Sequence, residues 1–200
     1  MTTALLSPPQ TRTPMRAPAP AEGPYRFTRA QYHRMGELGF FDGHRVELIR
    51  GEIVVMSPIS WPHTVSKIKT AEIARVIFQG AGWVNEQSPV VTDDSEPEPD
   101  VAVYRGKFVD YFDHPTPADT LLIVEVAVTS LAKDTTLKAE FYAQEGVADY
   151  WVVDVEHRRL LVFREPSASG YQSKRTLGDA DSVSPLAAPD ATVRVADLLP

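Results

Sequence analysis

A single acidic residue, Glu125, lies inside the most apolar strand-like segment of the chain, residues 120–128 (TLLIVEVAV). Such a run is typical of a strand that is buried on both faces. An ionised carboxylate in a buried strand is costly unless a cation meets it. Glu125 is therefore expected either to form a structural salt bridge with a nearby Arg or Lys, or to bind a metal ion.

A second carboxylate, Asp100, opens the strand-like segment DVAVY, directly after the acidic, Pro-rich loop DDSEPEP. This strand precedes that of Glu125 in the sequence, so the two carboxylates converge on one ion if the strands are neighbours in the sheet. Two hard oxygen ligands with open positions favour Mg²⁺ or Mn²⁺. Alternatively, Asp100 simply ends an acidic loop.

Three further residues could complete such a site. Lys138 follows Glu125 by thirteen residues, on a predicted helix. It is either an ordinary solvated lysine or an ammonium group that orients the attacking water and stabilises a phosphorane-like transition state. Glu47 is a third acidic ligand, a residue that orients a ligand, or the polar face of an edge strand. His63 is a helix-entry residue, a phosphate contact or a proton carrier near neutral pH.

The hydrophobic pattern predicts the elements that hold these residues. A helix begins after Thr28 and ends near Gly39, and a hairpin turns at Arg50-Gly51. A long helix follows over residues 64–79, and a later helix is capped by Asp134 or Thr135 and ends at Gly146. Further strands are expected at 83–92, 100–104, 120–128, 149–155 and 159–165, with edge strands near 171–176 and 191–195. The predicted fold class is α/β, of mixed α+β order, with a central mixed β-sheet flanked by helices, an N-terminal helix and β-hairpins.

Composition limits the organisation and the location of the protein. Six of the 17 prolines fall in the first 24 residues, so residues 1–24 are predicted to be a disordered Pro-rich segment and residues 25–200 to form one domain. The absence of cysteine excludes thiol chemistry and favours a cytoplasmic protein. No signal-peptide-like or membrane-spanning segment is visible, so no membrane association is expected.

Charge and missing motifs exclude several function classes. The formal net charge of −7 argues against general electrostatic coating of nucleic acid, so a nucleic-acid enzyme would need local help such as a bound cation. The histidines are too widely spaced for an HExxH zinc site, and no GxxxxGK[ST], GxGxxG or GxSxG motif occurs. Trp83 and Trp151 lie in predicted strands and are interpreted as core residues.

The order of the motifs resembles the PD-(D/E)XK nuclease superfamily and, more closely, its Uma-two family of restriction endonuclease-like proteins. The matching segments span about residues 27–164: VELIRGEIVVMSP, His63 at a helix start, Pro99-Asp100-Val101 and IVEVAVTSLAKDTTLKAEFYAQEGVADYWVVD. The last segment is the most specific, because its strand acid is followed by Asp nine residues later and by Lys four residues after that. The resemblance implies a restriction-endonuclease-like core.

The resemblance also implies a metal site. Asp100 and Glu125 would hold Mg²⁺ or Mn²⁺, with Glu47 as a candidate third ligand. The superfamily places its lysine two residues after the strand acid, where this chain has Ala127. Lys138, on the following helix, would replace that lysine.

Other positions of the site are carried over from the family. Glu47 and His63 match positions that the family commonly keeps as Glu and His, and Gln144 is expected to line the site. Relatives usually carry polar residues directly after the strand Glu-Val, whereas this chain has Ala127-Val128. This difference argues against one of the contacts that would hold the metal ligands in place, but not against the ligand pair itself.

The activity implied by the resemblance is metal-dependent hydrolysis of DNA phosphodiester bonds, by a homodimer in which two sites cut two strands. Two alternatives remain open: a catalytically inactive binding or regulatory module with a nuclease fold, and a hydrolase that acts on RNA or a structured junction. Contacts to phosphate would come from a local basic rim of five residues, Arg45, Arg50, Lys67, Lys69 and Lys133.

Overall fold

The computed structural model describes residues 23–200, and the predicted segment 1–24 lies outside it except for its last two residues. The centre of the fold is a six-stranded sheet of order β3-β4-β5-β6-β7-β8. Only β5 and β6 are parallel within this sheet. This mixed sheet, flanked by helices, confirms the predicted fold class. The strands are β3 (Gly82–Asn85), β4 (Val101–Arg105), β5 (Thr120–Ala127), β6 (Asp149–Asp154), β7 (Arg159–Arg164) and β8 (Ser173–Gly178).

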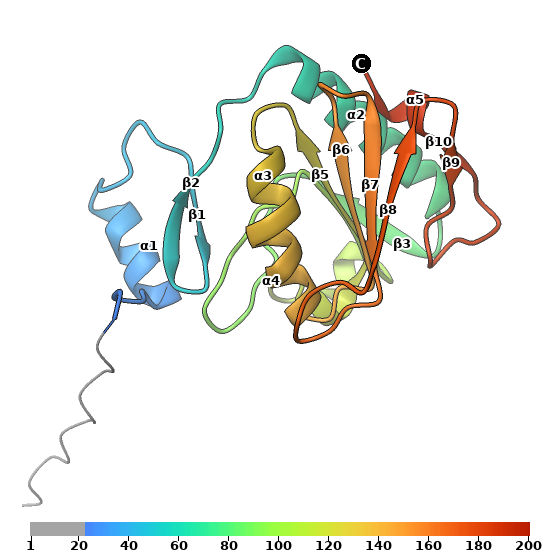
Figure 1. Cartoon of the computed structure of the whole chain (residues 1–200). Coiled ribbons are helices and arrows are strands. Elements are labelled where there is room, and N and C mark those ends of the chain that lie inside the picture. Colours follow the sequence, from blue (N-terminus) through green and yellow to red (C-terminus); the bar gives the residue numbers. More distant parts are fainter. Residues whose placement is uncertain (1–22) are drawn as a thin grey trace, which may run out of the picture.

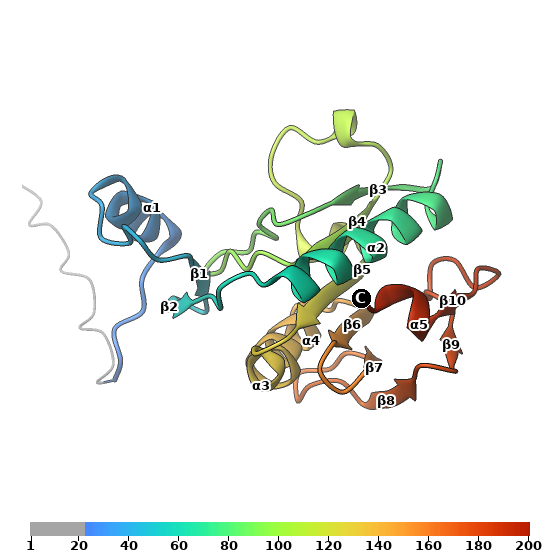
Figure 2. The same cartoon turned by 90° about the horizontal axis from the view of Figure 1, so that it is seen from above.

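Helices cover both faces of the sheet (Figures 1 and 2). On one face, α2 (Trp61–Ile77) and the C-terminal α5 (Val195–Leu198) pack against an apolar core that includes Val124 and Val126. On the other face, α4 (Ala139–Gln144) packs against a second core that includes Ile123 and Ala127. Because β5 contributes to both cores, it is buried on both faces, as its apolar sequence predicts.

The long helix α2 begins three residues before its predicted start at Thr64. The side chain of Ser60 caps it by accepting a hydrogen bond from the N–H of His63. Pro62 stands in the first turn, where its missing N–H leaves no helical hydrogen bond unmade. His63 therefore lies inside the first turn of α2 and is held by the cap.

An N-terminal arm, residues 25–60, lies beside the main sheet rather than within it (Figure 1). It contains α1 (Arg29–Glu37) and the antiparallel hairpin of β1 (Val46–Ile49) and β2 (Glu52–Val55). Both agree with the prediction, including the N-cap at Thr28. A hydrogen bond from the N–H of Glu96 to the carbonyl of Leu48 ties the hairpin to the rest of the chain.

The hairpin turn requires glycine at its second position. Gly51 has a φ of +72°, and a Cβ there would lie 2.8 Å from the Cβ of Arg26. A side chain at Gly51 would therefore displace the segment that leads into α1.

The helix that follows β5 begins earlier than predicted and contains a wide turn. α3 (Leu131–Lys133), the π-helical turn η3 (Asp134–Lys138) and α4 follow one another without a break after Ser130. Asp134 and Thr135 thus lie within the helix, and the prediction that one of them caps it is wrong. Turns of π-helix are frequent at functional sites, and here Asp134 and Lys138 are both buried.

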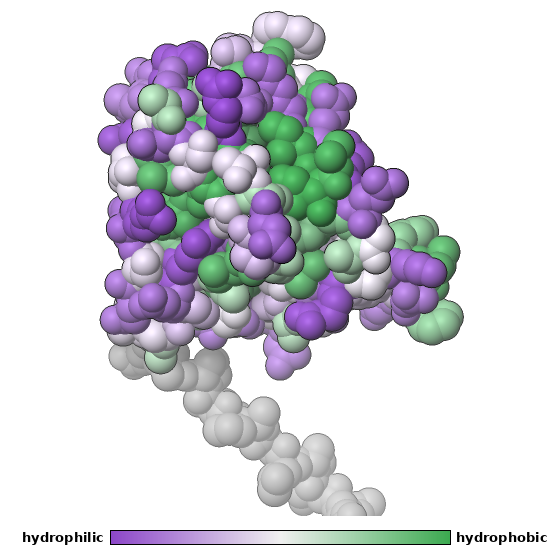
Figure 3. All heavy atoms as spheres, turned by 90° about the vertical axis from the view of Figure 1, so that its right-hand side faces the viewer, coloured by the Kyte–Doolittle hydropathy of each residue, from purple (hydrophilic) through white to green (hydrophobic). Residues whose placement is uncertain are grey.

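The remaining differences concern short elements. β3 ends at Asn85, short of its predicted end at residue 92, and two 3-10 turns, η1 (Phe108–Asp110) and η2 (Pro117–Asp119), lie between β4 and β5. The predicted edge strand near 191–195 pairs with β9 instead of the main sheet: β9 (Ser182–Val183) and β10 (Val193–Arg194) form a sheet of their own. On the side of β8–β10 and α5, hydrophobic residues gather in one patch among hydrophilic ones (Figure 3). No helix within residues 23–200 is long and apolar enough to cross a membrane.

Asp154, at the end of β6, is a buried carboxylate whose charge contributes to the stability of the fold. Its carboxylate accepts hydrogen bonds from His157 and Arg159. Burial raises the pKa of Asp154, but these two partners outweigh burial and hold it below its usual value. A lowered carboxyl pKa stabilises the fold above the unfolded-state pKa, and this contribution is lost as the pH falls through the folded-state pKa.

Asp154→Asn is therefore expected to reduce the free energy of unfolding by about 1 kcal/mol at neutral pH. The difference from the parent chain should shrink at strongly acid pH, because the contribution of the carboxylate is lost as the pH falls through the lowered folded-state pKa of Asp154. Urea unfolding of both chains at the two pH values measures the effect. An equal loss of unfolding free energy at both pH values would show that Asp154 stabilises the fold through packing and not through its charge.

Candidate active site

The two predicted carboxylates meet because their strands are neighbours. β4 and β5 are antiparallel, with Val101 opposite Val124, so Asp100 and Glu125 occupy opposite positions one step further along. Both residues are almost completely buried, with 7% and 3% of their surface exposed. The condition on which the sequence argument depended, adjacency of the two strands, is confirmed.

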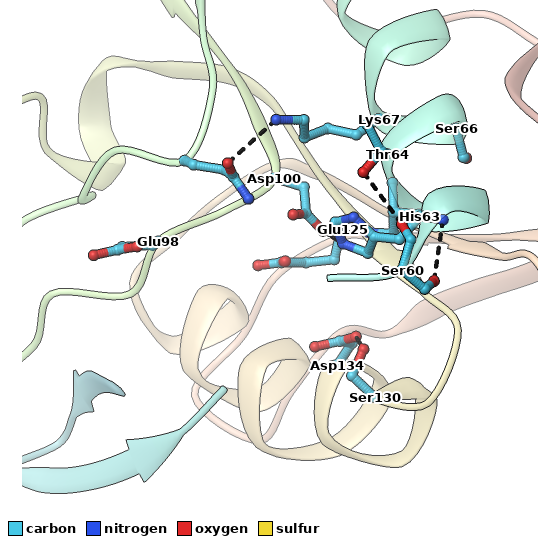
Figure 4. Close-up of polar contacts among 12 residues, drawn as sticks. Ser60, His63, Thr64, Ser66, Lys67, Glu98, Asp100, Glu125, Ser130 and Asp134 are labelled. Carbon is cyan, nitrogen blue, oxygen red and sulfur yellow. Dashed lines mark hydrogen bonds and ion pairs between the residues drawn. The ribbon is translucent and has the colours of Figure 1, made fainter. Parts of the chain in front are cut away.

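Asp100 is held by the backbone of β5 and by α2. Its Oδ2 atom accepts a hydrogen bond of 2.8 Å from the N–H of Val126 and lies 3.1 Å from Nε2 of His63. A carboxylate can only accept, so Nε2 carries the proton of this contact. The other ring nitrogen, Nδ1, is buried and finds no hydrogen-bond partner among residues 23–200. The first turn of α2 thus brings a free imidazole nitrogen to the same site (Figure 4).

Glu125 lies between an ammonium group and other acids. Its Oε1 atom is 2.9 Å from Nζ of Lys138 and accepts a longer hydrogen bond of 3.4 Å from Tyr142. Burial raises the pKa of Glu125 well above its usual value, and the neighbouring Asp134 and Asp100 raise it further, although Lys138 opposes them. The salt bridge considered from the sequence therefore exists, but it leaves Glu125 short of positive charge.

Glu47 enters from the N-terminal arm and contacts lysines. Its two oxygens lie 3.2 Å from Nζ of Lys133 and 3.1 Å from Nζ of Lys138, and it accepts a hydrogen bond from the N–H of Glu98. Burial raises the pKa of Glu47, but Lys138 and Lys133 outweigh burial and lower it. This geometry favours the reading of Glu47 as a residue that orients Lys138.

Asp134 is a site residue that the sequence reasoning missed. It is buried in the π-helical turn, accepts a hydrogen bond from Ser130 and lines the same pocket as Glu125 and Lys138. Burial raises its pKa, against the opposing charge of Lys138. Its position four residues before Lys138, on one helix face, is the signal that could have identified it.

Asp100, Glu125 and Asp134 line a small pocket of about 40 Å³, large enough for an ion and little more. Two lysines, Lys133 and Lys138, line it too, and Glu47 contacts both of them. Burial alone would lower the pKa of Lys138, but Glu125, Glu47 and Asp134 outweigh it and raise the pKa, so this lysine is charged. Four carboxylates face two ammonium groups, which leaves two negative charges in excess when all are ionised. A further cation fits this imbalance. The carboxylates are Glu47, Asp100, Glu125 and Asp134; the ammonium groups belong to Lys133 and Lys138.

A ligand set of three residues is not assembled. Among residues 23–200, no group of three or more His, Cys, Asp or Glu side chains is arranged to hold a metal ion. Asp100 and Glu125 thus remain the predicted pair of metal ligands, with Glu47 directed at the lysines.

The predicted rim of cations is largely neutralised by partners within the chain. Arg45 contacts Glu98, Arg50 contacts Glu140, and Lys67 contacts Glu86. Lys69 donates to the carbonyl of Leu199, and Lys133 contacts Glu47. Gln144 is exposed on α4, where it bonds with Arg50 and does not line the pocket, so its predicted place in the site is wrong.

The comparisons with known proteins identify a family and a similar fold. The model of the Uma2 family, described as "Putative restriction endonuclease", matches residues 29–196. The fold is similar to a crystal structure of "a putative nuclease belonging to DUF820" from Anabaena variabilis. The TM-score is 0.67 at 13% sequence identity, with 86% of this chain and 97% of the other covered. The search of curated proteins found no match.

Proposed function

The chain belongs to the Uma2 family, and from this premise we propose that it is a divalent-metal-dependent endonuclease that hydrolyses DNA phosphodiester bonds. The observation that carries the proposal is the convergence of Asp100, Glu125 and Lys138 on one pocket, where the buried carboxyl groups outnumber the ammonium groups. Phosphodiester hydrolysis needs positive charge that balances the negative charge of the transition state. A pair of carboxylates can bind a metal cation, and a lysine adds its own ammonium group.

Asp100 and Glu125 would hold the cation, Mg²⁺ or Mn²⁺, because both offer hard oxygen ligands at one point of the sheet. When bound, the ion supplies a Lewis acid that polarises the scissile phosphate. The uncompensated charge at Glu125 supports this assignment, since its burial and the acids Asp134 and Asp100 raise its pKa.

The remaining two residues would orient the attacking water and accept its proton. Lys138 is charged and held between Glu125 and Glu47, so its Nζ can orient the attacking water and balance negative charge on the phosphate. His63 donates from Nε2 to Asp100, which leaves the lone pair of Nδ1 free to accept a proton from water.

One observation favours a second candidate, a catalytically inactive module with a nuclease fold. Lys138 by itself already forms an ion pair with Glu125, so a purely structural role for the pair is consistent with the contact. Cleavage assays separate the two functions.

The decisive experiment incubates the full chain with end-labelled single-stranded and duplex DNA, in Mn²⁺, in Mg²⁺ and in EDTA. Cleavage is expected with a divalent ion and not in EDTA. Asp100→Asn should lower the rate by about 100-fold or more, because it removes a charge from the metal site. Asp93→Asn, the same change at an exposed position of the acidic loop, is the control and should cut like the parent. Failure of the parent to cut either DNA, or equal rates for both variants, would contradict the proposal.

A further inference from the structure

A buried tyrosine of the central sheet, Tyr150, is bonded to the helix that carries Lys138. Tyr150 lies in β6 and is fully buried, and its hydroxyl donates a hydrogen bond of 2.8 Å to the backbone carbonyl of Asp134. Asp134 is the first residue of the π-helical turn η3, and Lys138 is its last. Tyr150 therefore holds the backbone of the turn that brings Lys138 to the pocket.

The register of the sheet places this contact on the same face as Glu125. β5 and β6 are parallel, with Ile123 opposite Tyr150 and Glu125 opposite Val152. Because side chains alternate along a strand, Tyr150 and Glu125 point from neighbouring strands to one face of the sheet. This strand pair thus carries Glu125 and, through Tyr150, also fixes the turn that ends in Lys138.

The contact is of a kind that the helix cannot supply for itself. A π-helical turn is a rare departure from the regular ladder of helical hydrogen bonds. The hydroxyls of Thr135 and Thr136 donate to the carbonyls of Leu131 and Ala132, but these bonds stay inside the helix. Among residues 23–200, Tyr150 is the one side chain from another element that bonds to the backbone of η3. It alone among these hydroxyls ties the helix to the sheet.

The geometry of the pocket depends on the shape of this turn. An α-helical turn holds fewer residues than a π-helical turn, so closing η3 to a regular helix would rotate the residues on its two sides relative to each other. Asp134 and Lys138 could then not both keep their places in the pocket. Nζ of Lys138 lies 2.9 Å from Glu125 and 3.1 Å from Glu47, so such a rotation would lengthen one or both contacts.

We propose that Tyr150 is a positioning residue for Lys138: its hydroxyl holds the π-helical turn on β6 and thereby keeps the ammonium group between Glu125 and Glu47. For its effect on catalysis, this inference rests on the proposed nuclease function. The hold on the turn does not depend on cleavage, and it can be followed in the chain without metal or substrate.

Amide hydrogen exchange of the full chain, measured without divalent ions, tests the hold on the turn. Tyr150→Phe keeps the ring, which packs against the rings of Tyr142 and Phe163, and removes only the hydroxyl. Exchange in residues 131–138 is expected to become about fivefold faster, the effect of one lost hydrogen bond. Exchange in β7 should stay as in the parent.

The same variant is then compared with the parent in metal binding and in cleavage. Its rise in Tm with Mn²⁺ should equal that of the parent, because Asp100 and Glu125 are unchanged. In Mn²⁺, kcat should fall by about tenfold with little change in KM, since a misplaced Lys138 affects the reaction more than the binding of substrate.

Tyr171→Phe is the matched control. The ring of Tyr171 stacks on that of Tyr150, and its hydroxyl donates a hydrogen bond of 2.8 Å to the carbonyl of Val147. Val147 follows α4 and lies outside the π-helical turn. The control removes the same group from the same aromatic cluster, so it should leave kcat and the exchange of residues 131–138 unchanged.

Three results would overturn the inference. The first is parent-like exchange in residues 131–138 of Tyr150→Phe. The second is faster exchange spread equally over the helix and the sheet, because lower stability alone would produce it. The third is an unchanged kcat in Tyr150→Phe when the parent cuts DNA. Selectively faster exchange in residues 131–138, with a parent chain that cuts no DNA, would contradict the proposed nuclease function alone.

Discussion

Replacing Glu125 with glutamine is expected to lower divalent-dependent cleavage on the order of 10³-fold while the chain stays folded. The change keeps the size of the side chain and an oxygen that can accept from Lys138, and it removes a negative charge from a residue that is only 3% exposed. The loss should therefore appear in the rate and in metal binding together.

Metal binding by the Glu125→Gln chain can be followed without a substrate. A ligand that binds only the folded state raises stability by about 2.7 kcal/mol at 100 times its Kd. For a chain of this size that corresponds to a rise of about 5–10 °C in Tm. The parent should show this rise in Mn²⁺, and Glu125→Gln should not.

The control for this experiment is Glu156→Gln, the same substitution at an exposed position between β6 and β7. It should respond to Mn²⁺ as the parent does. An equal rise in Tm for the parent and Glu125→Gln would place the metal elsewhere. The absence of a rise in both would reduce Glu125 to a partner of Lys138 and favour the inactive module.

The sequence identified the residues whose environment is set by local pattern. Glu125 could be recognised because an acid in a continuous apolar strand must meet a cation, and the structure supplies Lys138. Asp100 required only that two successive strands be neighbours, which is common in sheets and occurs here. The hairpin of the N-terminal arm followed from its turn residues in the same way.

The remaining features depend on contacts between distant segments. Helical spacing gives no sign of the π-helical turn that carries Asp134 and Lys138, because the extra residue is accommodated by packing. The partners of Arg50 and Lys67 lie in other elements, so a list of cations could not tell a phosphate-binding rim from internal ion pairs.

Glu47 shows in the same way that the sequence alone does not assign a role to each site residue. Its carboxylate type was compatible with a metal ligand and with an orienting residue, and sequence could not choose between them. The N-terminal arm brings it to Lys133 and Lys138, and its contacts with these two lysines favour the orienting role. The second predicted effect tests how much the fold depends on that arrangement.

Replacing Lys138 with methionine is expected to destabilise the fold by about 3–5 kcal/mol, because Glu125 and Glu47 lose their shared buried cation. Without it the folded-state pKa values of both carboxyls rise, so the deficit should be largest at high pH and should shrink as the pH falls and the two carboxyls become protonated. Lys133→Met is the matched control: it removes a partly exposed lysine with one of the same contacts, and should cost no more than about 1 kcal/mol. Urea unfolding across this pH range measures both. If Lys138→Met were as stable as the parent at every pH, the lysine would not neutralise the buried acids, and its role in orienting water would lose its physical basis.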